Sequence, residues 1–138
     1  MYRKILVAFD GSIQAHSAFR HGLEIAACGH SELIVASVVH LPEPGTRVEL
    51  DATIEDSKRQ FEEGFGKLRS EATERGIELR TEVLVGHPAE QLIQFSEREG
   101  VDLVVTGRRG RSTFDRWLIG SVSTRLLRYA HCPVLVVR

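Results

Sequence analysis

Residues 101–124 read VDLVVTGRRGRSTFDRWLIGSVST, and the interpretation of the whole chain starts from this stretch. A short apolar run leads into a loop that contains three glycines, Gly107, Gly110 and Gly120. Glycine has no Cβ, so its backbone can approach a ligand closely and successive N–H groups can converge on an anion. Ser121 then opens a predicted helix over residues 121–129, whose N-terminus adds unpaired N–H groups. The stretch therefore predicts a phosphate-binding loop between a strand and a helix.

The spacing of these glycines differs from the two common nucleotide motifs. No Lys follows a glycine as a GxxxxGK[ST] loop requires, and GxGxxG does not follow the first predicted strand. The pattern, Gly-x2-Gly-x9-Gly-Ser, resembles the nucleotide loop of the universal stress protein family, in those members that bind ATP. The opening KILVAFDGS, the central GHPAEQLI and the closing HCPVLVVR also resemble that family in order and spacing. The resemblance covers essentially the whole chain.

Length and charge restrict the class of protein. The 138 residues are 42% hydrophobic, which predicts one domain, residues 1–138, with a single core. Lys and Arg number 18 against 19 for Asp and Glu, so a net charge of −1 attracts neither nucleic acid nor anionic lipid. No apolar run approaches the roughly 18 residues of a membrane span. We therefore expect a cytoplasmic protein without a membrane or nucleic-acid partner.

Other local features support the same expectation. The run of arginines at 108, 109 and 111 lacks the interleaved aromatic residues of a nucleic-acid surface. Cys28 and Cys132 have no CxxC spacing, so we expect reduced, packed thiols. The six histidines are scattered, and His16 and His21 do not share a helical face, so the sequence predicts no metal site.

Apolar runs and amphipathic segments alternate along the chain. The predicted strands are residues 5–9, 32–40, 77–85, 103–105 and 133–137. One predicted helix follows Ser12, and three others cover residues 51–75, 89–99 and 121–129. Residues 41–50 form a predicted loop. This alternation predicts an α/β fold with a parallel sheet and right-handed crossovers, but it does not fix the strand order. The family resemblance implies a Rossmann-like open five-stranded parallel sheet of order 3-2-1-4-5 with helices on both faces. Ligands of such sheets bind where the order reverses, beyond strands 1 and 4.

That order would bring Asp10 opposite Gly107 across one crevice. The carboxylate there can accept hydrogen bonds from ribose hydroxyls or lie in the second shell of a Mg²⁺ ion carried by the phosphates. The resemblance places Asp10 at the nucleotide; a turn or capping role is the alternative, and the two can coexist. We include Ser12, the expected N-cap of the first helix, in the predicted site.

The family resemblance implies the rest of an ATP site. It places Gly107, Gly110, Gly120 and Ser121 around the ribose and triphosphate, continued by Val122 and Ser123; the alternative for these residues is plain turn chemistry. Arg108 and Arg109 depart from the small polar residue that many members carry. We expect one of them to contact phosphate, although such arginines are often solvated. Ala8, Phe9 and either Val38 or Val39 are predicted to line an adenine pocket, a position where any βα fold carries apolar residues.

The last strand and the lack of a catalytic set complete the prediction. Val134–Val137 would form an apolar sheet edge, which pairing in a homodimer would cover, as the family resemblance also implies; cover by the domain's own helices is the alternative. Asp10 alone does not make a hydrolase or kinase site, so we expect slow or absent ATP turnover and no enzyme.

Three functional hypotheses follow from these features. The leading one is a cytosolic, ATP-binding, homodimeric universal stress protein, a regulator whose nucleotide state alters its affinity for an unknown protein partner. The second is a nucleotide-independent interaction or chaperone-like module of the same fold. The third is an enzyme that uses ATP, either a weak ATPase or one of the adenine-nucleotide α-hydrolase kind.

Overall fold

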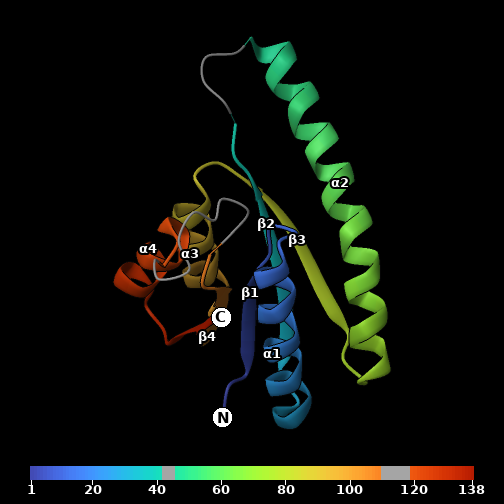
Figure 1. Ribbon diagram of the computed structural model, residues 1–138, viewed down its shortest axis with the longest axis vertical. Coiled ribbons are helices and arrows are strands. Elements are labelled where there is room, and N and C mark those ends of the chain that lie inside the picture. Colours follow the sequence, from blue (N-terminus) through green and yellow to red (C-terminus); the bar gives the residue numbers. More distant parts are fainter. Residues whose placement is uncertain (42–45, 110–118) are drawn as a thin grey trace.

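The computed structural model describes residues 1–41, 46–109 and 119–138, which form a five-stranded sheet covered by helices (Figure 1). The elements in chain order are β1 (Lys4–Ala8), α1 (Ile13–Gly29), β2 (Glu32–Val39), α2 (Arg47–Glu74), β3 (Leu79–Val85), α3 (Pro88–Glu99), β4 (Leu103–Gly107), α4 (Ser121–Tyr129) and β5 (Val134–Val137). All strand pairs are parallel, in the order β3-β2-β1-β4-β5. The predicted α/β fold and its strand order are confirmed.

Alternate residues of the central strands supply two cores, one on each face of the sheet. Ile5 and Val7 of β1 belong to the core shared with α1 and α2. Leu6, between them, belongs to the core shared with α3 and α4. Figure 1 shows these two helix pairs on opposite sides of the sheet. Strands covered on both faces are apolar at nearly every position, which is the pattern of residues 5–9 and 32–39.

Helix α1 follows its predicted pattern. The Ser12 hydroxyl accepts the Ala15 N–H at 3.1 Å and so caps the helix. The predicted apolar face is buried; it consists of Ala15, Ala18, Phe19, Gly22, Leu23 and Ala26. Gly22 lets the helix lie close to β1, because a Cβ at this position would be 2.7 Å from Val7 Cγ2. Helix α1 therefore packs closely against β1.

Helix α2 begins earlier than predicted, at Arg47, so the predicted loop over residues 41–50 is shorter. Thr46 and Glu49 form a capping box: the Thr46 hydroxyl accepts the Glu49 N–H at 3.2 Å, and the Glu49 carboxylate accepts the Thr46 N–H at 3.0 Å. Only the later turns of α2 pack on the sheet, and the first turns of this helix extend past the strands in Figure 1. Neither α2 nor any other helix in the described ranges is long and apolar enough to cross a membrane.

One of the two thiols that were predicted to be packed is exposed, and so is the ring of Tyr129. Tyr129 is 55% exposed because it ends α4, and the Arg125 guanidinium lies over its ring at 5.8 Å. Cys28 is exposed near the end of α1, whereas Cys132 is partly buried; both thiols are free. None of Tyr129, Cys28 and Cys132 lines the pocket described below.

Candidate functional site

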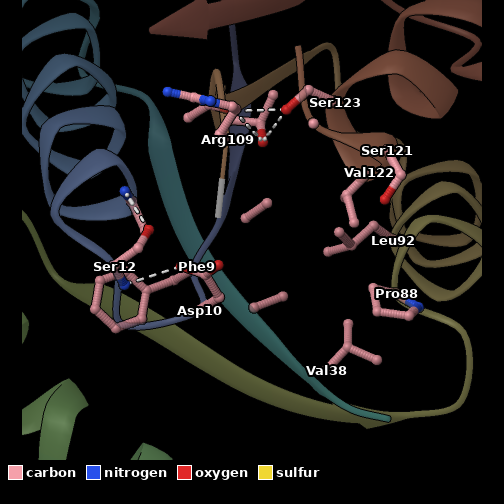
Figure 2. A pocket seen from close by; sticks show the side chains of 16 residues that line it. Phe9, Asp10, Ser12, Val38, Pro88, Leu92, Arg109, Ser121, Val122 and Ser123 are labelled. Atoms are coloured by element: carbon pink, nitrogen blue, oxygen red, sulfur yellow. Dashed lines mark hydrogen bonds between the residues drawn. The ribbon is translucent and has the colours of Figure 1, made fainter. Parts of the chain in front are cut away.

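A pocket of about 270 Å³ opens beyond the carboxyl ends of β1 and β4 (Figure 2). This is where the strand order reverses, because β1 pairs with β2 on one side and with β4 on the other. The chain leaves β1 toward α1 on one face and enters α4 on the opposite face. In parallel α/β sheets the diverging connections leave a crevice at such a point, and ligands bind there.

The turn after β1 forms a polar wall. Asp10 and Ser12 both line the pocket. Asp10 Oδ1 accepts the Ser12 N–H at 2.9 Å across Gly11, whose φ of 84° lies in the left-handed region that favours glycine. Asp10 therefore stabilises the turn and also faces the pocket. Among the described residues, no donor reaches its second oxygen, Oδ2.

The start of α4 forms the opposite side of the pocket. Gly120 is the N-cap, and no side chain caps the helix. The first intrahelical bond runs from the Thr124 N–H to the Gly120 carbonyl at 3.0 Å, so the N–H groups of Ser121, Val122 and Ser123 precede it. These three residues line the pocket. Their N–H groups, with the positive end of the helix dipole, form a site that suits an anion.

Backbone hydrogen bonds hold the two described ends of the glycine loop together. The Gly120 N–H donates to the Arg108 carbonyl at 2.7 Å, and the Arg108 N–H donates to the Val137 carbonyl at 2.6 Å. A Cβ on Gly120 would lie 3.3 Å from Arg109 Cα, so the missing side chain permits this approach. Gly110, the middle glycine of the predicted motif, lies outside the described residues.

The two predicted arginines differ in position. Arg109 lines the pocket, and its Nε is buried without a hydrogen-bond partner among the described residues. Arg108 does not line the pocket, and its backbone connects Gly120 to β5. A buried donor with no protein acceptor is rare, so Arg109 is the arginine whose environment fits an anionic ligand.

Aliphatic side chains form the remaining wall. Figure 2 shows Val38, Pro88, Leu92 and Val122 grouped across the pocket from Asp10 and Ser12. Ala8 also lines the pocket, as predicted, but Val39 does not. Val39 is buried and follows Val38 by one residue, so its side chain points to the other face of the sheet.

The structure adds lining residues that the sequence prediction omitted from the site. Pro88 and Leu92 lie in the first turns of α3, within the GHPAEQLI segment that carries the family resemblance. That resemblance was the available signal for them. Thr106, Ala15 and Ala36 also line the pocket and have no distinguishing pattern in the sequence.

Gly107 lines the pocket as predicted, and its carbonyl accepts the buried Ser123 hydroxyl at 2.5 Å. Ser123 therefore offers the pocket its N–H rather than its hydroxyl.

Comparison with known proteins gives a consistent result. The universal stress protein family model matches residues 1–138. A universal stress protein of Methanocaldococcus jannaschii is 35% identical over 144 residues, an alignment that covers 100% of this chain and 83% of that protein. The UspA structure from Lactobacillus plantarum is 26% identical with a TM-score of 0.81, covering 99% of this chain and 98% of that one. A universal stress protein from Archaeoglobus fulgidus, solved in complex with dAMP, is 26% identical with a TM-score of 0.71 and the same coverage of both chains.

Proposed function

Because the chain belongs to the universal stress protein family, we propose that its pocket at the β1–β4 reversal point binds an adenine nucleotide, ATP in the cell. One observation carries this proposal: the uncapped start of α4 faces Asp10 across a pocket whose remaining wall is aliphatic. An anion site, a carboxylate and an apolar surface are the three environments that phosphates, ribose and base require. The dAMP complex of the Archaeoglobus fulgidus protein supports the choice of an adenine nucleotide.

The residues present fit each part of such a ligand. The aliphatic wall of Val38, Pro88 and Leu92 would contact the base. Asp10 Oδ2 would accept a ribose hydroxyl. The first N–H groups of α4 and Arg109 Nε would donate to phosphate oxygens. Asp10 is the only carboxylate among the described lining residues, so Mg²⁺ would arrive on the phosphates rather than occupy a protein cage.

We propose that the protein is a regulator with little or no ATP turnover. The described lining residues include one carboxylate and no histidine or lysine, so they offer no second acid or base.

Arg108 connects the pocket to the sheet edge: its carbonyl accepts the Gly120 N–H, and its own N–H donates to the Val137 carbonyl of β5. A nucleotide that moves the glycine loop would therefore also move β5. We place this function in the cytosol, where free thiols persist, and expect an unknown protein partner to respond to it.

We propose that β5 is also the homodimer edge. The two outer strands differ in charge. On β3, Arg80 and Glu82 form an ion pair at 3.0 Å, and Arg80 also pairs with Glu99 at 2.9 Å. Charged edges discourage strand pairing. By contrast, β5 carries only aliphatic residues, and Val134, Leu135 and Val136 are only partly buried within one chain. Pairing with a second copy would cover them.

The experiment that tests nucleotide binding begins with protein purified without added nucleotide. The protein is denatured and its supernatant is run on ion-exchange chromatography, while a stripped sample is titrated with Mg-ATP, Mg-ADP and AMP by calorimetry. We expect co-purified adenine nucleotide or saturable heat with ATP. If neither appears, the nucleotide proposal is wrong and the nucleotide-independent interaction module becomes the better hypothesis.

A further inference from the structure

We propose that His40 and His87 together bind one late first-row transition metal dication, of which Zn²⁺ is the example tested below, at the outer rim of the pocket. The rings of these two histidines lie side by side, with centroids 5.3 Å apart and planes inclined at 52°. Imidazole nitrogen is a preferred ligand of Zn²⁺, Ni²⁺ and Cu²⁺ but not of Mg²⁺. The proposal does not depend on whether the pocket binds a nucleotide.

The sheet fixes the two histidines next to each other. Val39 at the end of β2 pairs in register with Val85 at the end of β3. The Gly86 N–H extends this pairing by donating to the Val39 carbonyl at 2.9 Å. His40 directly follows Val39, and His87 directly follows Gly86, so strand pairing and this hydrogen bond set their backbone positions. Such preorganisation lowers the entropic cost of chelation.

The ring separation matches two imidazoles on one tetrahedral ion. Zn²⁺ binds imidazole nitrogen at about 2.0 Å with tetrahedral geometry, and that nitrogen lies about 1.1 Å from the ring centre, so the centres of two bound rings are roughly 5 Å apart. The observed separation is 5.3 Å. Ring packing without a metal produces similar distances, and the titration below separates the two explanations.

Both rings are accessible to an ion. His40 and His87 are exposed, and within the described ranges no hydrogen bond engages their ring nitrogens. His21 differs, because its Nδ1 is hydrogen-bonded to the Ser17 carbonyl at 2.8 Å. Within the same ranges, no group of three or more His, Cys, Asp or Glu could hold a metal ion. The described residues would therefore supply two ligands, and water would complete the coordination among them.

The proposed site adjoins the pocket without forming part of its wall. Val38, two residues before His40, and Pro88, directly after His87, both line the pocket, whereas the histidines do not. A bound ion would hold the ends of β2 and β3 together beside that wall. Substitution of either histidine can therefore be tested without removing a residue that we assign to the nucleotide.

The test uses full-length protein without an affinity tag, stripped with a chelator and titrated with ZnCl₂ by calorimetry at neutral pH. His40→Gln and His87→Gln are compared with wild type, and His21→Gln, on the outer face of α1, is the matched control. Circular dichroism and thermal unfolding verify that all four proteins are folded. The Cu²⁺ complex provides a second measurement, because its paramagnetic resonance spectrum reports the nitrogen ligands.

We expect wild type and His21→Gln to take up one Zn²⁺ per chain, and each of the other variants to lose this uptake. The proposal is overturned if wild type shows no saturable uptake, or if His40→Gln and His87→Gln bind Zn²⁺ as wild type does.

Discussion

The Ser123 hydroxyl donates a 2.5 Å hydrogen bond to the carbonyl oxygen of Gly107, and this buried contact joins α4 to the end of β4. The two residues lie on either side of the glycine loop. Thr106 adds a second hydroxyl nearby, with its Oγ1 3.5 Å from Ser123 Oγ. The loop is therefore anchored at both ends by buried polar contacts, independently of any ligand.

Replacing Ser123 by Ala removes the hydroxyl that donates to the Gly107 carbonyl. The Thr106 hydroxyl still donates to this carbonyl at 3.3 Å, so the acceptor keeps one partner. We therefore expect the free energy of unfolding to fall by about 0.5–1.5 kcal/mol, the net contribution of one hydrogen bond. Urea denaturation measures this change. Ser121→Ala is the control, since Ser121 is exposed two residues earlier in the same helix. Equal stability of the two variants would contradict the anchoring role.

Gly107 also has a steric role that a glycine motif alone does not reveal. A Cβ at this position would lie 2.8 Å from Gln14 Cβ and 2.9 Å from the Gln14 carbonyl carbon, so α1 and β4 would have to separate. We expect Gly107→Ala to destabilise the protein by about 1–3 kcal/mol through overpacking. Gly66→Ala is the matched control: apart from its chain neighbours and the backbone of its own helix, no atom lies within 4 Å of the added Cβ. This substitution should stabilise α2 by up to about 1 kcal/mol. Thermal unfolding of the two variants should shift in opposite directions.

The elements of this fold were predictable where local pattern and packing agree. Apolar runs marked β1, β2, β4 and β5, a partly alternating pattern marked β3, and the family resemblance supplied their order. The T-x-x-E capping box of Thr46 and Glu49 was also present in the sequence, but the nearby Pro42, Pro44 and Gly45 favoured a longer loop. Tyr129 continued the helical spacing of Leu126, yet α4 ends there and the ring is exposed.

Parts of the site depend on three-dimensional relationships that spacing does not encode. Val38 and Val39 could not be distinguished, because a strand buried on both faces shows no polar alternation. His40 and His87 are far apart in sequence, and only the β2–β3 register brings them together. The close approach of Gly120 to Arg109 joins two ends of a loop and is likewise not encoded in the spacing.

Asp10 Oδ1 accepts the Ser12 N–H, and we propose that Oδ2 accepts a ribose hydroxyl; a conservative substitution can separate these two roles. Asp10→Asn keeps a carbonyl oxygen for the Ser12 N–H but replaces the second acceptor by an amide donor. We expect ATP affinity to fall about tenfold, the cost of one charge-assisted hydrogen bond, with little change in stability. Asp10→Ala should lower both the ATP affinity and the free energy of unfolding, because it removes both oxygens. Calorimetry measures the ATP affinity of both variants, and urea denaturation measures their stability. Undiminished ATP affinity in Asp10→Asn would exclude a ligand role for this carboxylate.

Asp102 gives the stability a pH dependence. Its carboxylate accepts the backbone N–H groups of Arg3 at 2.9 Å and Lys4 at 3.0 Å, which fixes the start of β1. Desolvation raises the pKa of Asp102, but these hydrogen bonds outweigh it and hold the pKa below the ordinary value of 3.8.

Because the folded pKa is the lower one, this contribution to stability is present above about pH 4 and disappears as the pH falls through the folded pKa. We expect Asp102→Asn to lower the free energy of unfolding by about 1 kcal/mol at neutral pH, and the difference from wild type to shrink in acid. Urea denaturation across a pH series measures both effects. Asp56→Asn, at an exposed position of α2, is the control, and a pH-independent difference for Asp102→Asn would refute the assignment.

The proposed dimer edge can be tested by placing a charge on β5. Val136 is partly buried in the edge strand, where it pairs with Thr106 of β4. A lysine there would sit in a strand-to-strand interface between two copies and would have to be desolvated, so we expect Val136→Lys to convert a dimer into a monomer on light scattering. Val48→Lys is the control, because Val48 is 79% exposed on α2, away from β5. A dimeric mass for both variants would place the interface elsewhere, whereas loss of the dimer in Val136→Lys alone would establish β5 as the edge that two copies share.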